Sequence, residues 1–331
     1  MGKVSPVRLE HDAVAMELYD HPDNPVPAGA ICQQVTTPDG IRLRTARWMP
    51  DRSPLKGTVT LLQGRAEFIE KYFETVADLR ARGFAVVTFD WRGQGGSQRL
   101  LSNPYRGHVD DFADFVTDLD TVMSEVTLAA MPGPHHVLAH STGGAVLLLA
   151  AGRLRTRIER AVLSAPLIGL GKVGLPQKVI CPLSAALSSI GLGTAFVPGG
   201  NAKFHMPFEG NPLTSDEVRF RRNEAVLSAH PDLEVGAPTI DWLAAACRAM
   251  TRFFEPDFGP SLQVPVLLVA STGDQIVSPR ASERFARQTR SCRYLEIAGS
   301  RHELLMEDDF HRDQFLAAFD AFVAEGEPAA A

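Results

Sequence analysis

The chain has 331 residues, of which 45% are hydrophobic and 22% are charged, and its formal net charge is -6. This balance is typical of a globular protein with a large core, and the negative charge argues against a nucleic-acid partner. The first thirty residues contain no apolar segment of the signal-peptide type, and no apolar run is long enough to cross a bilayer. We therefore expect a cytoplasmic protein, with loose contact at the inner face of a membrane left open.

The first half of the chain predicts a mostly parallel sheet. Residues 1–28 are polar and rich in Asp and Pro, so we expect an N-terminal arm with weak order. A Pro-Asp-Gly turn then joins two extended runs in a hairpin. From there to residue 165, β-rich runs alternate with amphipathic helical stretches, which predicts crossovers and helices on both faces. The predicted strands are 31–36, 41–48, 58–62, 84–89, 136–139 and 161–164, and the helices are 68–79, 109–130 and 143–155.

The alternation stops between residues 166 and 260. Nearly a hundred residues between two adjacent strands are too many for a connecting loop. This segment begins with a Gly-rich apolar stretch, 167–200, and continues with helical stretches at 216–228 and 239–254. We therefore predict a helical cap, 166–260, inserted between two parts of one core, 29–165 and 261–325. The second part holds predicted strands at 266–270 and 294–297 and helices at 281–288 and 309–323.

The spacing of the cysteines predicts no disulfide bonds. They lie far apart and form no C-x-x-C pair, at positions Cys32, Cys181, Cys247 and Cys292. This pattern favours reduced thiols over disulfides or a zinc site, and we expect no metal and no organic cofactor.

A candidate nucleophile lies where a predicted strand gives way to a predicted helix, in the sequence Ala-His-Ser-Thr-Gly-Gly from Ala139 to Gly144. A nucleophile elbow requires this setting, because a sharp turn lifts the serine oxygen above the sheet and small neighbours let the chain bend. The usual pattern is G-x-S-x-G, and Ala139 replaces its first glycine. Taken alone, this short motif favours an ordinary turn serine.

The order of residues along the chain strengthens the interpretation. The α/β-hydrolase fold requires serine, then an acid, then histidine, each directly after a strand. Asp274 follows the predicted strand 266–270, and His302 follows the strand 294–297. We therefore predict Ser141 as nucleophile, His302 as general base and Asp274 as the acid that orients it. Asp90, which also ends a strand, is the second choice for the acid, although we expect it to brace a turn.

The remaining polar residues near these positions have simpler interpretations. We expect the His140 side chain to pack away from the site, and we expect His108 and Asp111 to cap and solvate the start of a helix. An acyl-transfer site also needs donors for an oxyanion. We predict the backbone N–H groups of Thr142 and Arg65. The Arg65 side chain is expected to form a weak ion pair with Glu67.

These segments resemble the monoacylglycerol lipase and lysophospholipase branch of the α/β hydrolases, and most closely the bacterial lysophospholipase L2 group. The likeness extends from about residue 35 to residue 322. It implies the α/β-hydrolase fold, hydrolysis of single-chain lipid esters, and oxyanion donors at Arg65 and Thr142. Gln63 departs from the histidine that monoacylglycerol lipases usually carry there. The segments that carry the resemblance are 64–67, 90–95, the Ser141 elbow, Gly273-Asp274, His302-Glu303, and 211–214 and 236–242 in the cap.

The predicted activity is two-step acyl transfer on a lysophospholipid or a monoacylglycerol. Three alternatives stay open: a broad carboxylesterase or thioesterase, an aminopeptidase of the proline-iminopeptidase type, and a non-enzymatic binding protein. The cap is expected to roof an apolar acyl pocket and to provide contact with a membrane surface. Candidate pocket walls are Leu183, Leu187, Phe196, Phe204 and Phe208, each of which could instead be plain core packing. The oligomeric state does not follow from the sequence.

Overall fold

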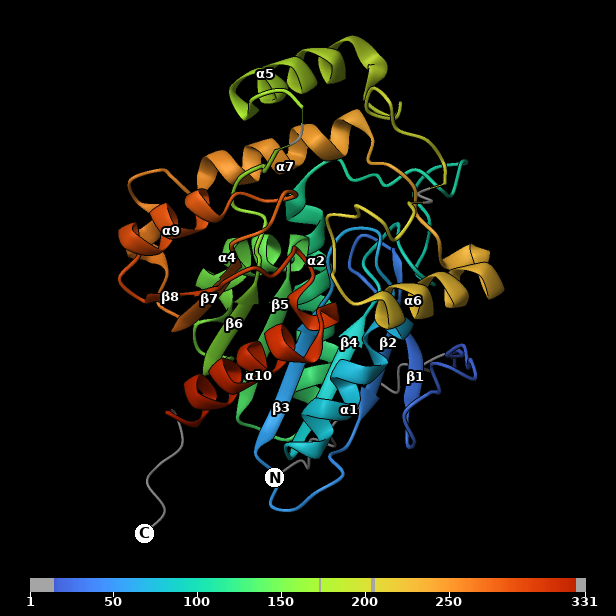
Figure 1. Cartoon of the computed structure of the whole chain (residues 1–331), viewed down its shortest axis with the longest axis vertical. Helices are drawn as coiled ribbons and strands as arrows, with labels where there is room; N and C mark the ends of the chain where they lie inside the picture. The colour runs from blue at the N-terminus through green and yellow to red at the C-terminus, as the bar shows by residue number, and fades with distance from the viewer. Residues whose placement is uncertain (1–14, 173, 204–205, 326–331) are drawn as a thin grey trace, which may run out of the picture.

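Figure 1 presents the computed structural model of the chain, which describes residues 15–172, 174–203 and 206–325. One eight-stranded sheet crosses the molecule in the order β1-β2-β4-β3-β5-β6-β7-β8. Strands β3 to β8 run parallel, and β2 is antiparallel to both of its neighbours. The strands are β1 (Ile31–Thr36), β2 (Arg42–Trp48), β3 (Gly57–Leu62), β4 (Phe84–Phe89), β5 (His135–His140), β6 (Arg160–Ser164), β7 (Val266–Ser271) and β8 (Cys292–Ile297).

Helices cover both faces of this sheet, as the alternating pattern predicts. Every residue of β3, β4 and β7 is buried, as expected for parallel strands with cover on both sides. One face packs against α2 (Phe112–Val122), its continuation η2 (Met123–Thr127) and α3 (Leu128–Ala130), and against α4 (Thr142–Leu154) and α9 (Pro279–Gln288). The other packs against η1 (Ile69–Tyr72), α1 (Phe73–Ala81), η5 (Leu304–Met306) and α10 (Asp309–Ala324). None of the helices in the described ranges is long and apolar enough to span a membrane.

The segment between β6 and β7 is helical, in agreement with the predicted cap. Its elements are α5 (Gln177–Leu187), η3 (Ser188–Leu192), α6 (Glu217–Ala229), η4 (Pro231–Leu233), α7 (Ile240–Arg252) and α8 (Phe258–Ser261). Helices α6 and α7 match the predicted helical stretches closely. Helix α5 was not predicted, because its segment is rich in glycine and contains Pro182. Figure 1 shows α5 stacked on α7 at the outer end of the molecule, beyond the sheet.

Residues 15–28 do not form the weakly ordered arm that their composition predicts. The Tyr19 N–H donates to Glu70 Oε1 at 3.1 Å, and the Asn24 side-chain amide donates to the Glu70 carbonyl at 2.9 Å. The Trp48 indole N–H donates to the Pro27 carbonyl at 3.0 Å. These specific bonds fix the segment along the sheet. The first fourteen residues of the predicted arm lie outside the described ranges.

A disulfide joins the two stacked cap helices. Cys181 of α5 is bonded to Cys247 of α7, with 5.5 Å between their Cα atoms, while Cys32 and Cys292 are free thiols. The prediction of four reduced cysteines is therefore wrong for this pair. The two residues are 66 positions apart in the chain, and without a predicted α5 nothing in the sequence brings them together. The cysteines no longer support the cytoplasmic address, which stays a prediction.

Candidate active site

The sharp turn between β5 and α4 presents Ser141. Its backbone has φ 49° and ψ -112°, an unusual conformation for a residue with a side chain. The turn is held by the Ser141 N–H, which donates to the Ser164 carbonyl at 3.0 Å, and by the Ser141 carbonyl, which accepts from the Leu167 N–H at 3.0 Å. A Cβ on Gly143 would lie 2.6 Å from the Gln63 carbonyl oxygen, so this position requires glycine.

The backbone conformation also explains why Ala139 can replace the first glycine of the elbow motif. Ala139 belongs to β5 and pairs there with Leu62 and Leu163, so its backbone is extended. An extended residue does not need the conformational freedom of glycine. Its methyl group is fully buried in the core. Alanine at this position is therefore compatible with the elbow.

The structure brings together the three side chains that were predicted to act as one unit. His302 Nε2 lies 3.0 Å from Ser141 Oγ, and His302 Nδ1 lies 2.6 Å from Asp274 Oδ2. The other carboxylate oxygen of Asp274 accepts the N–H groups of Ile276 and Val277 at 2.7 and 3.0 Å. All three side chains are at least nine-tenths buried. This geometry would let His302 exchange a proton with the Ser141 hydroxyl while Asp274 holds the imidazole.

The electrostatic environment favours a histidine that can accept a proton. Burial alone lowers the pKa of His302, but the charge and hydrogen bond of Asp274 outweigh it, and the pKa lies above its usual value. The neighbouring His140 behaves differently, because burial lowers its pKa to about 4. At neutral pH the site therefore holds one neutral imidazole, that of His140, beside one that is readily protonated.

The two amides predicted as oxyanion donors flank Ser141 in the turn and in the loop after β3. In the described part of the chain, neither the Arg65 N–H nor the Thr142 N–H donates to a protein acceptor. The Arg65 side chain does not pair with Glu67 as predicted. It donates to the Gly236 carbonyl at 2.8 Å, and its guanidinium lies 5.8 Å from the centre of the Trp242 ring. Arg65 thus links this loop to the cap.

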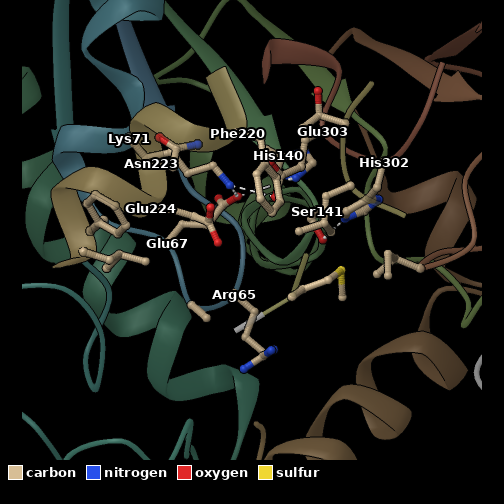
Figure 2. Close-up of a pocket in the computed structure, with 17 residues that line it drawn as sticks. Arg65, Glu67, Lys71, His140, Ser141, Phe220, Asn223, Glu224, His302 and Glu303 are labelled. Carbon is tan, nitrogen blue, oxygen red and sulfur yellow. Dashed lines mark hydrogen bonds and ion pairs between the residues drawn. The ribbon is translucent and has the colours of Figure 1, made fainter. Parts of the chain in front are cut away.

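Two cavities of different character reach Ser141. The larger, about 520 Å³, lies between the cap and the sheet and is lined mainly by aliphatic side chains. The smaller, about 220 Å³, is shown in Figure 2 and combines charged groups, including Glu67, Lys71 and Glu303, with apolar side chains such as Phe68 and Leu227; we call it the polar chamber because of these charged groups. Arg65, Ser141 and Ile276 border both cavities. The serine hydroxyl therefore lies at the junction of an apolar and a polar chamber.

The five predicted pocket walls have different positions. Leu183 and Leu187 of α5 line the apolar chamber. Phe196 does not, because its ring packs under the Arg106 guanidinium at 5.5 Å. Phe208 does not line either chamber and contacts the Phe220 ring instead. Phe204 lies outside the described residues. Walls of the apolar chamber that sequence reasoning missed include Ile180, Trp242 and Leu243.

The polar chamber was not anticipated. His140, expected to point away, lines it, and its ring lies 4.8 Å from the His302 ring. Asn223 and Glu224 reach it from α6, as Figure 2 shows. The spacing of Glu67 and Lys71, four residues apart, could have suggested their ion pair, but nothing local predicts their contact with the histidine loop.

The alternative residues have structural roles. Asp90 Oδ2 accepts from the Arg44 side chain at 2.7 Å and from the Gly96 N–H at 2.8 Å, so it braces the turn after β4. Asp111 caps α2 through the Ala113 N–H. His108 bonds the Thr239 hydroxyl at 3.0 Å, which ties the start of that helix to the cap.

The sheet topology and the linked side chains of Ser141, His302 and Asp274 at its edge, which we call the relay, define the class of protein. This chain is a serine hydrolase with the α/β-hydrolase fold. Its particular family follows from comparison with known sequences. Residues 53–309 match the Hydrolase_4 family, described as serine aminopeptidase S33, and the chain belongs to this family.

Curated relatives resemble the chain over most of its length. It is 29% identical to the probable lysophospholipase L2 of Haemophilus influenzae, over 86% of this chain and 88% of the relative. It is 31% identical to lysophospholipase L2 of Escherichia coli K12, over 80% of this chain and 79% of the relative. A shorter match, 31% identical over 39% of this chain and 44% of the relative, is to a monoacylglycerol lipase of Mycolicibacterium smegmatis.

Solved structures share the same fold. A monoglyceride lipase from Saccharomyces cerevisiae superposes with a TM-score of 0.73 at 19% identity, covering 91% of this chain and 98% of the other. A carboxyl esterase from Bacillus coagulans superposes with a TM-score of 0.70 at 16% identity, covering 90% and 99%. The predicted α/β-hydrolase fold is confirmed.

Proposed function

We propose that this protein hydrolyses the ester bond of single-chain lipids, a lysophospholipid or a monoacylglycerol, through an acyl-enzyme at Ser141. The observation that carries the proposal is the position of Ser141 Oγ, 3.0 Å from His302 Nε2 and at the junction of the two chambers. A single-chain lipid ester is divided in the same way as the two chambers, with an apolar acyl chain on one side of the ester carbonyl and a polar alcohol on the other. The lysophospholipase L2 relatives support this substrate class.

In the proposed reaction, His302 Nε2 takes the hydroxyl proton as Ser141 Oγ attacks the ester carbonyl carbon. Asp274 holds the imidazole in the tautomer that can accept this proton. The negative oxygen faces the N–H groups of Arg65 and Thr142. The carbon–oxygen bond to the alcohol then breaks, and the alcohol leaves with the proton from His302. A water molecule repeats the sequence on the acyl-enzyme and releases the fatty acid.

The apolar chamber predicts that activity rises with acyl length. Each methylene buried there can stabilise the transition state by about 0.8 kcal/mol, or up to about fourfold in kcat/KM. We expect kcat/KM to increase from acetyl to dodecanoyl esters of p-nitrophenol, and lysophospholipids and monoacylglycerols of the same chain to be cleaved. Amino-acyl naphthylamides, which an aminopeptidase would cleave, should not react. A flat or falling profile from acetyl to dodecanoyl contradicts the proposal.

A pair of variants on the cap locates this effect. Leu187 lines the chamber, whereas Val218, on cap helix α6, is 76% exposed and does not line it. Leu187→Trp should reduce kcat/KM for dodecanoyl esters more than for acetyl esters, because it fills the chamber. Val218→Trp should leave the ratio of the two activities unchanged. Equal effects of both variants would place the acyl chain elsewhere.

We also propose that the cap contacts anionic lipid surfaces. Ile190 and Leu192 follow α5 with 70% and 46% exposure, and Leu175, at 54%, precedes it. The exposed cations Lys178 and Arg280 line a groove beside α5. Leu175 lies at the same end of α5 as Lys178, and Ile190 and Leu192 lie at its other end. Exposed apolar side chains and cations on one helical surface are typical of proteins that bind anionic membranes.

The membrane contact predicts binding to vesicles that contain anionic phospholipid, weakening as salt increases. Ile190→Ser should lower the partition coefficient about tenfold, because burial of one such side chain contributes about 1.5 kcal/mol. Phe310→Ser is the matched control, since Phe310 is 73% exposed on α10, which lies apart from α5 (Figure 1). Co-sedimentation measures both. Equal loss in the two variants, or no binding by the parent protein, contradicts the contact.

A further inference from the structure

A buried ion triplet lies beside the candidate relay. Lys71 Nζ is 2.8 Å from Glu67 Oε1 and 2.7 Å from Glu303 Oε1. The three residues are only 8%, 4% and 7% exposed. Burying three charges costs several kcal/mol that their mutual attraction offsets only in part, so such a group is weak evidence for a stabilising role. Its position in the fold suggests what else it does.

One end of the triplet fixes the loop that carries a predicted oxyanion donor. Glu67 Oε2 accepts the Gly64 N–H, and it also accepts the Tyr72 hydroxyl at 2.6 Å. Gly64 directly precedes Arg65. In the same loop, Ala66 has a positive φ of 58°, a conformation that an alanine adopts only when its surroundings enforce it. The Glu67 carboxylate is therefore part of what holds this loop in shape.

The other end fixes the loop that carries the histidine. Glu303 directly follows His302, and its carboxylate contacts Lys71. Its backbone N–H donates to the Leu213 carbonyl of the cap at 2.8 Å. The histidine loop is thus held by the cap on one side and by Lys71 on the other. Figure 2 shows Lys71 and Glu67 to the left of Ser141, and Glu303 above it beside His302.

We propose that Lys71 is a positioning residue for the reaction, whose ammonium ties Glu67 of the oxyanion loop to Glu303 of the histidine loop. The inference rests on the proposed function, because the separation of the two loops matters for rate only if Ser141 performs the proposed acyl transfer. The tie sets the His302 imidazole relative to the Arg65 N–H. A displacement of about 1 Å between such groups costs on the order of a hundredfold in rate.

The triplet also sets the charge felt by His302. The carboxylates of Asp274, Glu303 and Glu67 raise the pKa of His302 against the effect of burial. Lys71 neutralises part of the charge of the last two. Without the ammonium, burial would favour the protonated form of Glu67, whose pKa Lys71 helps to hold low, so the loss of the cation and the loss of this carboxylate charge act on the pKa of His302 in opposite directions. The titratable and charged groups that face the imidazole from the surrounding elements are Asp274, Glu303, Glu67, Lys71, His140, Arg65 and Glu224.

Two variants test this role. Lys71→Met should shift the acid limb of the kcat/KM profile little, because the loss of the cation and the protonation of Glu67 offset each other at His302. Glu303→Gln should move that limb to lower pH, because it removes a negative charge. Both should lower kcat by about 10- to 100-fold with little change in KM, since the loops lose their tie. Fatty-acid release from dodecanoyl esters is the readout.

Controls separate positioning from other roles. Lys71→Arg keeps the cation and should recover much of the kcat that is lost in Lys71→Met. Lys56→Met, at the opposite end of β3, should change neither the acid limb nor kcat. If Lys71→Met does not fold, the shift in Glu303→Gln decides the question. An unchanged kcat in Lys71→Met or an unshifted acid limb in Glu303→Gln overturns the proposal, as does a rise in KM with unchanged kcat, which would make Lys71 a substrate-binding group. Failure of the proposed function would look different, because the parent protein would then release no fatty acid.

Discussion

Replacement of Ser141 by alanine is expected to lower kcat by on the order of 10⁶ while leaving the fold intact. The reaction needs the Ser141 oxygen, and removal of the nucleophile from a serine–histidine–aspartate relay costs about as much as removal of the whole relay. The hydroxyl that His302 contacts at 3.0 Å would be absent. Turnover of p-nitrophenyl dodecanoate by the purified variant measures the loss. Its circular dichroism spectrum and thermal unfolding should match those of the parent protein, because alanine fits the same turn.

A labelling experiment provides the control for Ser141→Ala. A fluorophosphonate probe reacts with an activated serine, so it should label the parent protein and not the variant. The same experiment addresses the alternative of a non-enzymatic binding protein, which would not be labelled. Turnover near that of the parent protein in Ser141→Ala would exclude Ser141 as nucleophile.

Replacement of Asp274 by asparagine is expected to lower kcat by on the order of 10⁴. The carboxylate accepts the Nδ1 proton of His302 at 2.6 Å, which leaves Nε2 free to take the serine proton. An amide can donate to Nδ1 instead and then favours the wrong tautomer. The charge of Asp274 also raises the pKa of His302, so the acid limb that remains should move to lower pH. Steady-state kinetics between pH 5 and 9 measure both effects, a window of about four units around the usual histidine pKa.

Two other aspartates serve as controls for Asp274→Asn. Asp257→Asn changes an exposed carboxylate that pairs with Arg252, and it should not alter kcat. Asp90→Asn should lower the unfolding temperature, because Asp90 braces a turn through Arg44 and Gly96. It should lower kcat far less than Asp274→Asn does. A negligible loss of kcat in Asp274→Asn together with a large one in Asp90→Asn would reverse the two assignments.

The sheet could be predicted from the sequence because each strand is marked by a short apolar run that is recognisable without its neighbours. Fully buried runs such as 84–89 and 266–271 read as parallel strands without any knowledge of their partners. The close approach of Ser141, Asp274 and His302 could also be expected, because the carboxyl ends of parallel strands meet at one edge of a sheet.

Features that depend on long-range contact could not be predicted. Helix α5 contains Pro182 and follows a glycine-rich stretch, and it is joined to α7 by a disulfide between residues 66 positions apart. Aromatic composition placed Phe196 and Phe208 in the pocket, but their partners are Arg106 and Phe220. In each of these cases the deciding contact comes from a residue that no local pattern identifies.

The covalent link between α5 and α7 limits how a substrate can enter. Leu183 and Leu187 of α5 and Leu243 of α7 line the apolar chamber, and the disulfide from Cys181 to Cys247 joins the same two helices. While that bond is intact, α5 and α7 stay joined at these two residues. Any mode of substrate entry that requires α5 to leave α7 at this point would therefore need reduction of the disulfide.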